Sequence, residues 1–223
     1  RKILSYRFVI PGSKKQGMIT SLMDKGKMVR LAEESGLNVP KSIEVAVSDI
    51  DAAFIDRLIY PCITKPLVSK NGTKADIHIF YSSQEFEQCY KRLKSERIQI
   101  QTFIEKELEY QLIGCSLNGG ETVIIPGASV ILRQPKNTNT GFLRYIPGFE
   151  ADIESCKRFL KSADFSGLFS MEFLRGKDGK DYFMETNFRN DGNAICVTAS
   201  GMNLPYIWVM FNWGHNIDEY IKN

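Results

Sequence analysis

Histidine is scarce in this sequence, and cysteine never occurs in a paired motif. Only two histidines, His78 and His215, occur in 223 residues, which is too few for a histidine metal site. The five cysteines stand singly inside apolar runs, so we expect small core residues in a reducing compartment. They are Cys62, Cys89, Cys115, Cys156 and Cys196.

Long apolar runs and strong charge are also missing. No stretch approaches the roughly 18 consecutive apolar residues of a membrane-spanning helix, and the mixed segment Arg1 to Tyr6 is too short for a signal peptide. The net charge of +3 is slight, and there is no basic tail or basic helix face. We therefore expect a cytoplasmic protein that binds small molecules rather than nucleic acid or membrane, with a homodimer left open.

Several catalytic motifs are absent as well. The sequence has no dinucleotide glycine fingerprint, no His-Glu-x-x-His helix and no nucleophile elbow. Gly12 and Gly17 have the spacing of a phosphate-binding loop, but Met18 and Ile19 stand where Lys and Ser or Thr are required. These absences exclude P-loop enzymes, zinc proteases of that type and enzymes with a nucleophile elbow.

The composition, 43% hydrophobic and 25% charged, is that of a globular chain with length for one large domain or two small lobes. There is no initiator Met, so we expect residues 1–20, with a strand at 4–10, to be a remnant of or linker from a preceding domain.

Residues 21–101 predict a small α+β lobe. Ser21 and Asp24 form a variant capping box for a helix that should stop near Gly36. Ser82 and Glu85 form a second capping box, and the polar loop 69–74 is a candidate lid. The other elements expected are a helix near 51–58 and strands at 42–47, 60–67, 75–81 and 98–102.

Residues 102–223 predict a larger, β-rich lobe. We expect strands at 109–117 and 122–133, a helix at 152–161 and a hairpin at Asp178-Gly179. The polar segment 134–149 is predicted to be a loop over a cleft, and 193–223 one or two helices.

The hairpin brings two carboxylates together. Residue pairs that face each other across Asp178-Gly179 sum to 357, so Glu172 lies opposite Glu185, although like charges opposed in a ladder are destabilising. Asn187 and Arg189 follow Glu185 on the same face at the two-residue period of a strand. Hard oxygen ligands of this kind suit Mg²⁺. The alternative is a solvated face on which the carboxylates pair with Lys177, Lys180 or Arg175.

Two lysines are candidate phosphate ligands. Lys65 lies in an apolar strand between Thr64 and Pro66, where a charge is costly unless it is used. The alternative is a snorkelling lysine on an edge strand. Lys25 is a weaker candidate, because lysines in the first turn of a helix are usually just solvated.

Taken together, these segments resemble the ATP-grasp enzymes from about Ser21 to Leu204. Met171 to Phe173 and Phe183 to Arg189 are similar to the paired acidic strands of the family, the second reading Glu-x-Asn-x-Arg as in its carbamoyl phosphate synthetase and biotin carboxylase branches. Asp24-Lys25 resembles the family's Asp-Lys helix start. The segment 60–66 resembles the strand that carries its second phosphate-binding lysine.

The resemblance implies an α+β ATP-grasp fold, with two lobes that clasp ATP, and it implies residue roles. Lys25 and Lys65 would bind phosphates, the backbone at Thr102, Phe103 and Ile104 would bind adenine, and Glu109 the ribose. The hinge position usually held by an acid is Gln101 here, and the lid has only one glycine, with Lys70 and Lys74 as added cations.

Mg²⁺, or Mn²⁺ in its place, would be held by Glu172, Glu185 and Asn187, while Arg189 and Lys65 are the expected catalytic cations. The implied activity is an Mg²⁺-dependent ligase that turns a carboxylate into an acyl phosphate for attack by an amine or similar nucleophile. The alternatives are a carboxylase or carbamoyl phosphate-forming enzyme that acts on bicarbonate, a nucleotide-binding module without catalysis, and a plain α+β binding domain.

Overall fold

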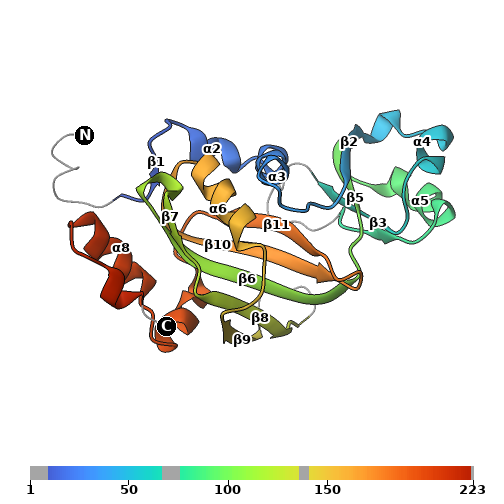
Figure 1. The fold of residues 1–223 in the computed structure, drawn as a ribbon. Helices are drawn as coiled ribbons and strands as arrows, with labels where there is room; N and C mark the ends of the chain where they lie inside the picture. The colour runs from blue at the N-terminus through green and yellow to red at the C-terminus, as the bar shows by residue number, and fades with distance from the viewer. Residues whose placement is uncertain (1–9, 67–75, 136–140, 222–223) are drawn as a thin grey trace. The chain divides into compact units, whose positions relative to one another are not determined.

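The computed structural model describes residues 10–66, 76–135 and 141–221, and the chain forms two compact units (Figure 1). Unit 1 comprises residues 1–39 and 106–223, and unit 2 comprises residues 40–105. The expected strand at 4–9 and the candidate lid, with Lys70 and Lys74, lie outside the described residues.

Unit 1 is built on a seven-stranded antiparallel sheet in the order β1-β10-β6-β8-β9, with β11 paired to β10 and β7 paired to β6. Its strands are β1 (Gly12–Ser13), β6 (Lys106–Leu117), β7 (Thr122–Ile124), β8 (Gly127–Arg133), β9 (Phe142–Pro147), β10 (Phe165–Gly176) and β11 (Asp181–Asn187). Its α-helices are α2 (Met18–Leu22), α3 (Lys25–Glu34), α6 (Ile153–Ser162), α7 (Ile195–Ala199) and α8 (Leu204–Asn212), and its 3-10 turns are η3 (Asn118–Gly120), η4 (Gly192–Ala194) and η5 (Asp218–Tyr220).

The long strand β6 separates two cores, because successive side chains point to opposite faces of a sheet. Leu112 packs with Phe159 of α6 and Met28 of α3 on one face. Ile113 packs with Val197 of α7 and Leu204 of α8 on the other. Figure 1 shows α3 and α6 on the opposite side of the sheet from α8. Both faces of the central strands are therefore covered at this end of the sheet.

Helix α3 belongs to unit 1. The sequence had instead predicted that it forms one small lobe with the rest of residues 21–101. The helix packs against β11, where the Thr186 amide donates to Met28 Sδ at 3.2 Å and the Phe183 amide donates to the Asn38 carbonyl at 2.8 Å. The cap also differs from the prediction. Ser21 lies inside α2, and the Asp24 carboxylate caps α3 by accepting from the Lys27 amide at 3.0 Å.

Two expectations for the second half need correction. The strand predicted over 122–133 is two strands, β7 and β8, which both pair with β6. The segment 134–149, predicted as a loop, contains strand β9, which pairs with β8 from Gly127 to Arg133. Its polar composition hid an exposed strand, because an edge strand buries only part of its surface.

Unit 2 is a four-stranded antiparallel sheet in the order β2-β5-β3-β4 with a small core of its own, which includes Phe86, Ile98 and Ile100. Because β3 lies between β5 and β4, Lys65 is not on an edge strand. The elements are β2 (Ser42–Ala46), η1 (Val47–Asp49), α4 (Ala52–Asp56), β3 (Cys62–Pro66), β4 (Ile79–Phe80), α5 (Ser83–Cys89), η2 (Tyr90–Arg92) and β5 (Arg97–Thr102).

Within the described part of the chain, no single helix is both long and apolar enough to cross a membrane. One bent pair of helical segments, 192–199 with 204–212, passes that test by length and composition alone.

Candidate functional site

The predicted pairing of Glu172 with Glu185 is confirmed, but the register of the hairpin between the turn and this pair differs from the prediction. Near the turn, Arg175 pairs with Asp181 and Phe173 with Phe183, so facing residues there sum to 356 instead of 357. A β-bulge follows, in which Met184 is an extra residue on β11, and beyond it Glu172 pairs with Glu185. The bulge therefore restores the register that the simple two-residue turn predicted.

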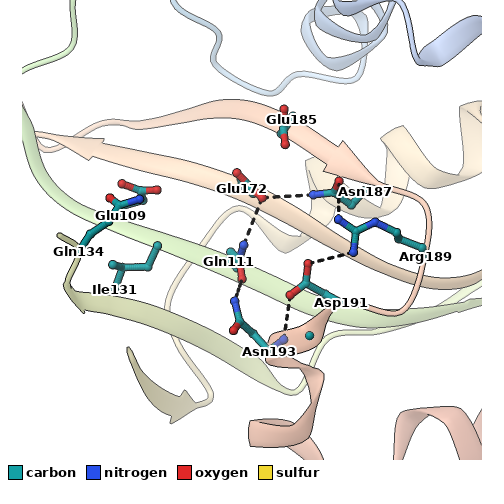
Figure 2. A pocket seen from close by; sticks show the side chains of 11 residues that line it. Glu109, Gln111, Ile131, Gln134, Glu172, Glu185, Asn187, Arg189, Asp191 and Asn193 are labelled. Atoms are coloured by element: carbon teal, nitrogen blue, oxygen red, sulfur yellow. Dashed lines mark hydrogen bonds and ion pairs between the residues drawn. The ribbon is translucent and has the colours of Figure 1, made fainter. Parts of the chain in front are cut away.

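The two glutamates line a cavity of about 440 Å³ in unit 1, together with Asn187 and Arg189 (Figure 2). The Asn187 amide donates to Glu172 Oε1 at 3.1 Å, and Arg189 donates to Asn187 Oδ1 at 3.4 Å. Glu185 has no hydrogen-bond partner among the described residues. All four residues predicted for the metal and catalytic cluster of this hairpin therefore lie around one cavity.

Three residues that sequence reasoning missed complete a ring of polar contacts in Figure 2. Gln111 on β6 donates to Glu172 Oε1 at 3.1 Å, and its side-chain Oε1 accepts from the side-chain amide of Asn193 at 2.7 Å. The Asp191 carboxylate accepts from the backbone N–H of Asn193 at 2.9 Å and lies 3.6 Å from Arg189. Two donors thus fix Glu172 through a single oxygen, which leaves Oε2 for a ligand.

Negative charge accumulates around Glu172. The pKa of its carboxyl is raised to about 7 from 4.5, mainly by burial and also by the charges of Glu185, Glu109 and Asp191, while the Gln111 hydrogen bond opposes the shift. Arg175, one of the cations considered as a partner for these glutamates, instead holds Asp181 in two bonds at 2.7 and 2.9 Å. A cation from outside would relieve this excess of negative charge.

The donor set fits a hard divalent cation that substrate oxygens complete. Among the described residues, no group of three or more His, Cys, Asp or Glu side chains is placed to hold a metal alone. The predicted set has only two carboxylates, with an amide oxygen as third donor. Magnesium sites of this composition take their remaining ligands from water and phosphate.

Lys25 adjoins the same edge of β11. It lines a second cavity, of about 340 Å³, together with Glu185, Asn187 and Arg189. Lys25 is the first residue of α3, where the partial positive charge of the helix terminus disfavours a cation. The charge of Lys25 therefore does not stabilise the helix, but together with the helix terminus it attracts anions to this cavity.

Glu109, predicted to bind a ribose, lines the 440 Å³ cavity at the end away from Arg189 (Figure 2). Its carboxylate pairs with Lys106 at 2.8 Å and its side chain is 23% exposed. The carboxylate is accessible to a hydroxyl ligand, because Lys106 occupies only Oε2.

In unit 2, Lys65 Nζ donates to Gln101 Oε1 at 2.7 Å. This partner of the lysine is therefore a neutral amide, at the hinge position where the ATP-grasp family usually has an acid.

The predicted adenine segment keeps one backbone N–H that is not used in a backbone hydrogen bond. The Thr102 and Phe103 amides donate to the carbonyls of Lys41 and Pro61, whereas Ile104 has no such bond among the described residues.

The comparisons with known proteins place the fold. No protein-family model and no curated protein sequence matches the chain. Among solved structures, N5-carboxyaminoimidazole synthetase from Staphylococcus aureus matches at a TM-score of 0.66 and 17% identity, over 87% of this chain and 52% of that one.

An L-amino acid ligase from Bacillus licheniformis matches at a TM-score of 0.59 and 17% identity, over 80% of this chain and 43% of the other. N5-carboxyaminoimidazole synthase from Aspergillus clavatus, in complex with ADP and 5-aminoimidazole ribonucleotide, matches at a TM-score of 0.62 and 13% identity. This match covers 86% of this chain and 51% of the other.

These structures share the ATP-grasp fold, and the chain has that fold, as the sequence predicted. These three neighbours are ligases, and the chain spans about half the length of each of them. At such low identity the likeness concerns the fold alone.

Proposed function

We propose that this chain is the ATP- and Mg²⁺-binding part of a ligase that activates a carboxylate as an acyl phosphate for attack by an amine or similar nucleophile. The observation that carries the proposal is the opposed pair Glu172 and Glu185, with a pKa of about 7 at Glu172. Stabilising that pair as two carboxylates requires an added cation. The structural likeness to an L-amino acid ligase and to a synthase in complex with ADP supports the same class.

The residues of unit 1 would act mainly through charge. Glu172, Glu185 and Asn187 would hold the metal, and Arg189 and Lys25 would offset charge on the transferring phosphoryl group. Bound there, a divalent cation would draw charge from the phosphate oxygens. Glu109 would accept a hydrogen bond from the ribose.

For unit 2 the proposal is separate. Lys65 would contact phosphate as a point charge, and the backbone at Thr102, Phe103 and Ile104 would hold the base. The hydrogen bond from Lys65 Nζ to Gln101 Oε1 orients the ammonium group.

The chemistry balances without a protein nucleophile. A carboxylate oxygen of the substrate attacks the γ-phosphorus as the bond to ADP breaks, and the amine then attacks the acyl carbon and expels phosphate, losing a proton to solvent. A carboxylase-type reaction would use bicarbonate as the first acid, and so an assay of ADP release includes bicarbonate beside amino acids and small acids.

Titration calorimetry of ATP with and without Mg²⁺ tests the metal assignment. We expect Glu185→Ala and Asn187→Ala to weaken Mg²⁺-dependent ATP binding roughly tenfold or more. Glu154→Ala is the matched control, because Glu154 is an exposed glutamate paired with Lys157 on α6. Unchanged affinity and metal dependence in both site variants would refute the assignment.

A further inference from the structure

The second cavity in unit 1 has an apolar wall that the proposed chemistry does not explain. We call it the methionine cavity, and its apolar lining is Ile19, Met23, Met28, Met184 and Phe188. Three of the chain's seven methionines therefore meet in one cavity. Met23 is 77% exposed, and a large apolar side chain gains little from such a position unless something covers it.

The polar end of the methionine cavity is shared with the candidate metal site. Glu185, Asn187 and Arg189 line both cavities, so a molecule seated against the methionines can bring one end to the proposed reacting centre. The bulge contributes directly, because the extra residue that it inserts into β11, Met184, is part of the apolar wall.

Two cations stand at this end. Lys25 has no ion-pair partner among the described residues, and Arg189 is 63% exposed with its carboxylate partner, Asp191, at 3.6 Å. Arginine and lysine with spare donors recognise carboxylates. The opposite wall offers methionine side chains, which are polarisable and adapt to irregular apolar groups.

We propose that the methionine cavity receives the acid substrate, with the carboxylate at Arg189 and Lys25 and an apolar substituent against Met23, Met28 and Met184. The inference rests on the proposed ligase function and narrows its substrate to acids with an apolar side group. A cavity of about 340 Å³ is at the small end of ligand sites, which favours a short branched aliphatic or a compact aromatic group.

The test uses acids of matched shape. Isocaproate and succinamate differ in whether an isopropyl or a carboxamide group ends the chain, and leucine and asparagine form the corresponding amino-acid pair. The measurements are calorimetric affinity for ATP with Mg²⁺ and then acid-dependent ADP release. We expect the apolar member of at least one pair to be preferred roughly tenfold or more in kcat/KM.

Met23→Glu should abolish that preference, because it places a carboxylate beside the apolar group. Met23 is exposed, so the substitution should not affect folding. Met23→Leu should keep the preference, and Ile59→Glu, which alters another exposed apolar residue that lies in unit 2, should leave it unchanged.

The outcomes separate the two proposals. If the protein binds ATP with Mg²⁺ but uses apolar and polar acids equally, or if the preference survives Met23→Glu, the methionine cavity does not hold the substrate and the ligase proposal stands. If neither kind of acid supports ADP release, the methionine-cavity proposal fails and only the assignment of ATP and Mg²⁺ binding stands. If ATP with Mg²⁺ does not bind, both proposals fail.

Discussion

The ionisation of Glu172 links the candidate site to the stability of the protein. Its pKa of about 7 in the fold lies above its ordinary value of 4.5. The folded state therefore holds this proton more tightly than the unfolded state does. The corresponding stabilisation is complete below about pH 4.5 and is lost as the pH rises through 7. Without a metal, the ionised site opposes folding at higher pH.

We therefore predict that Glu172→Gln stabilises the metal-free protein at about pH 8 by about 1 to 2 kcal/mol, a value reduced for partial solvent exposure. At about pH 4, where the carboxyl is already protonated, the gain should vanish. Thermal unfolding at both pH values measures the difference. Glu154→Gln, at an exposed position, is the control, and an equal gain at both pH values would contradict the prediction.

The amide of Gln111 is predicted to be a positioning group for Glu172. Gln111→Leu removes the donor at 3.1 Å and leaves Asn193 without its acceptor. We expect Mg²⁺-dependent ATP affinity to fall roughly 10- to 100-fold, and the pH at which metal binding sets in to rise, since this hydrogen bond lowers the pKa of Glu172.

Ser129 provides the control, because it lies opposite Gln111 in the ladder and its buried hydroxyl has no hydrogen-bond partner among the residues that the structure describes. Ser129→Ala should leave the affinity unchanged. A loss of the same size in both variants would indicate general damage to the sheet.

At this scale the sequence predicted the members of one hairpin and missed the rest of the ring. Glu172, Glu185 and Asn187 follow from strand periodicity around one turn. Gln111 lies 61 residues from Glu172, and nothing local to it marks the contact. Asp191 and Asn193 fall beyond the end of β11, where the two-residue period no longer places side chains.

Among the elements, strand β11 shows how a correct prediction can rest on an incorrect step. The count from Asp178-Gly179 assumed a two-residue turn and a regular ladder, but the structure has another register at the turn and a bulge at Met184. The two departures cancel at Glu185. A bulge has no reliable sequence signal, because it depends on what the extra residue packs against.

Deletion of Met184 should consequently be tolerated by the ladder. Phe183 would be followed directly by Glu185, and both are already paired with adjacent residues, Phe173 and Glu172. We expect a cooperatively folded protein that retains Mg²⁺-dependent ATP binding, measured by thermal unfolding and calorimetry.

Deletion of Thr186 is the matched comparison. It would bring Asn187 to the position opposite Met171 and turn its side chain to the core face, since a shift of one residue reverses the face. Metal-dependent binding should then disappear. Comparable behaviour of the two deletions would mean that the bulge does not set the register of the site.

For the whole molecule, the sequence predicted two lobes but not where the chain divides. The helix at 25–34 looked like part of the first lobe because it precedes it directly, whereas its packing partner, β11, begins about 150 residues later in the chain. Local patterns identify elements well, but they do not show which sheet an amphipathic helix covers.

The separate cores of the two units predict separate local stabilities. Phe86 is fully buried in the core of unit 2, and Phe86→Ala should cost about 3 to 5 kcal/mol there. Hydrogen exchange should accelerate in α5 and β5 and remain slow in β6 and β10. Phe169→Ala, in the core of unit 1, should give the reverse pattern. Uniform acceleration in both units would show that they unfold as one.

The insertion of unit 2 between Val39 and Lys106 also sets an order for folding during synthesis. The residues of α3 leave the ribosome long before β11, the strand that they pack against, has been translated. Everything that unit 2 needs for its sheet lies within residues 40–105. Because domains tend to fold as units as they emerge, unit 2 can fold first. The apolar face of α3 remains exposed until the last third of the chain, which contains β11, has been translated.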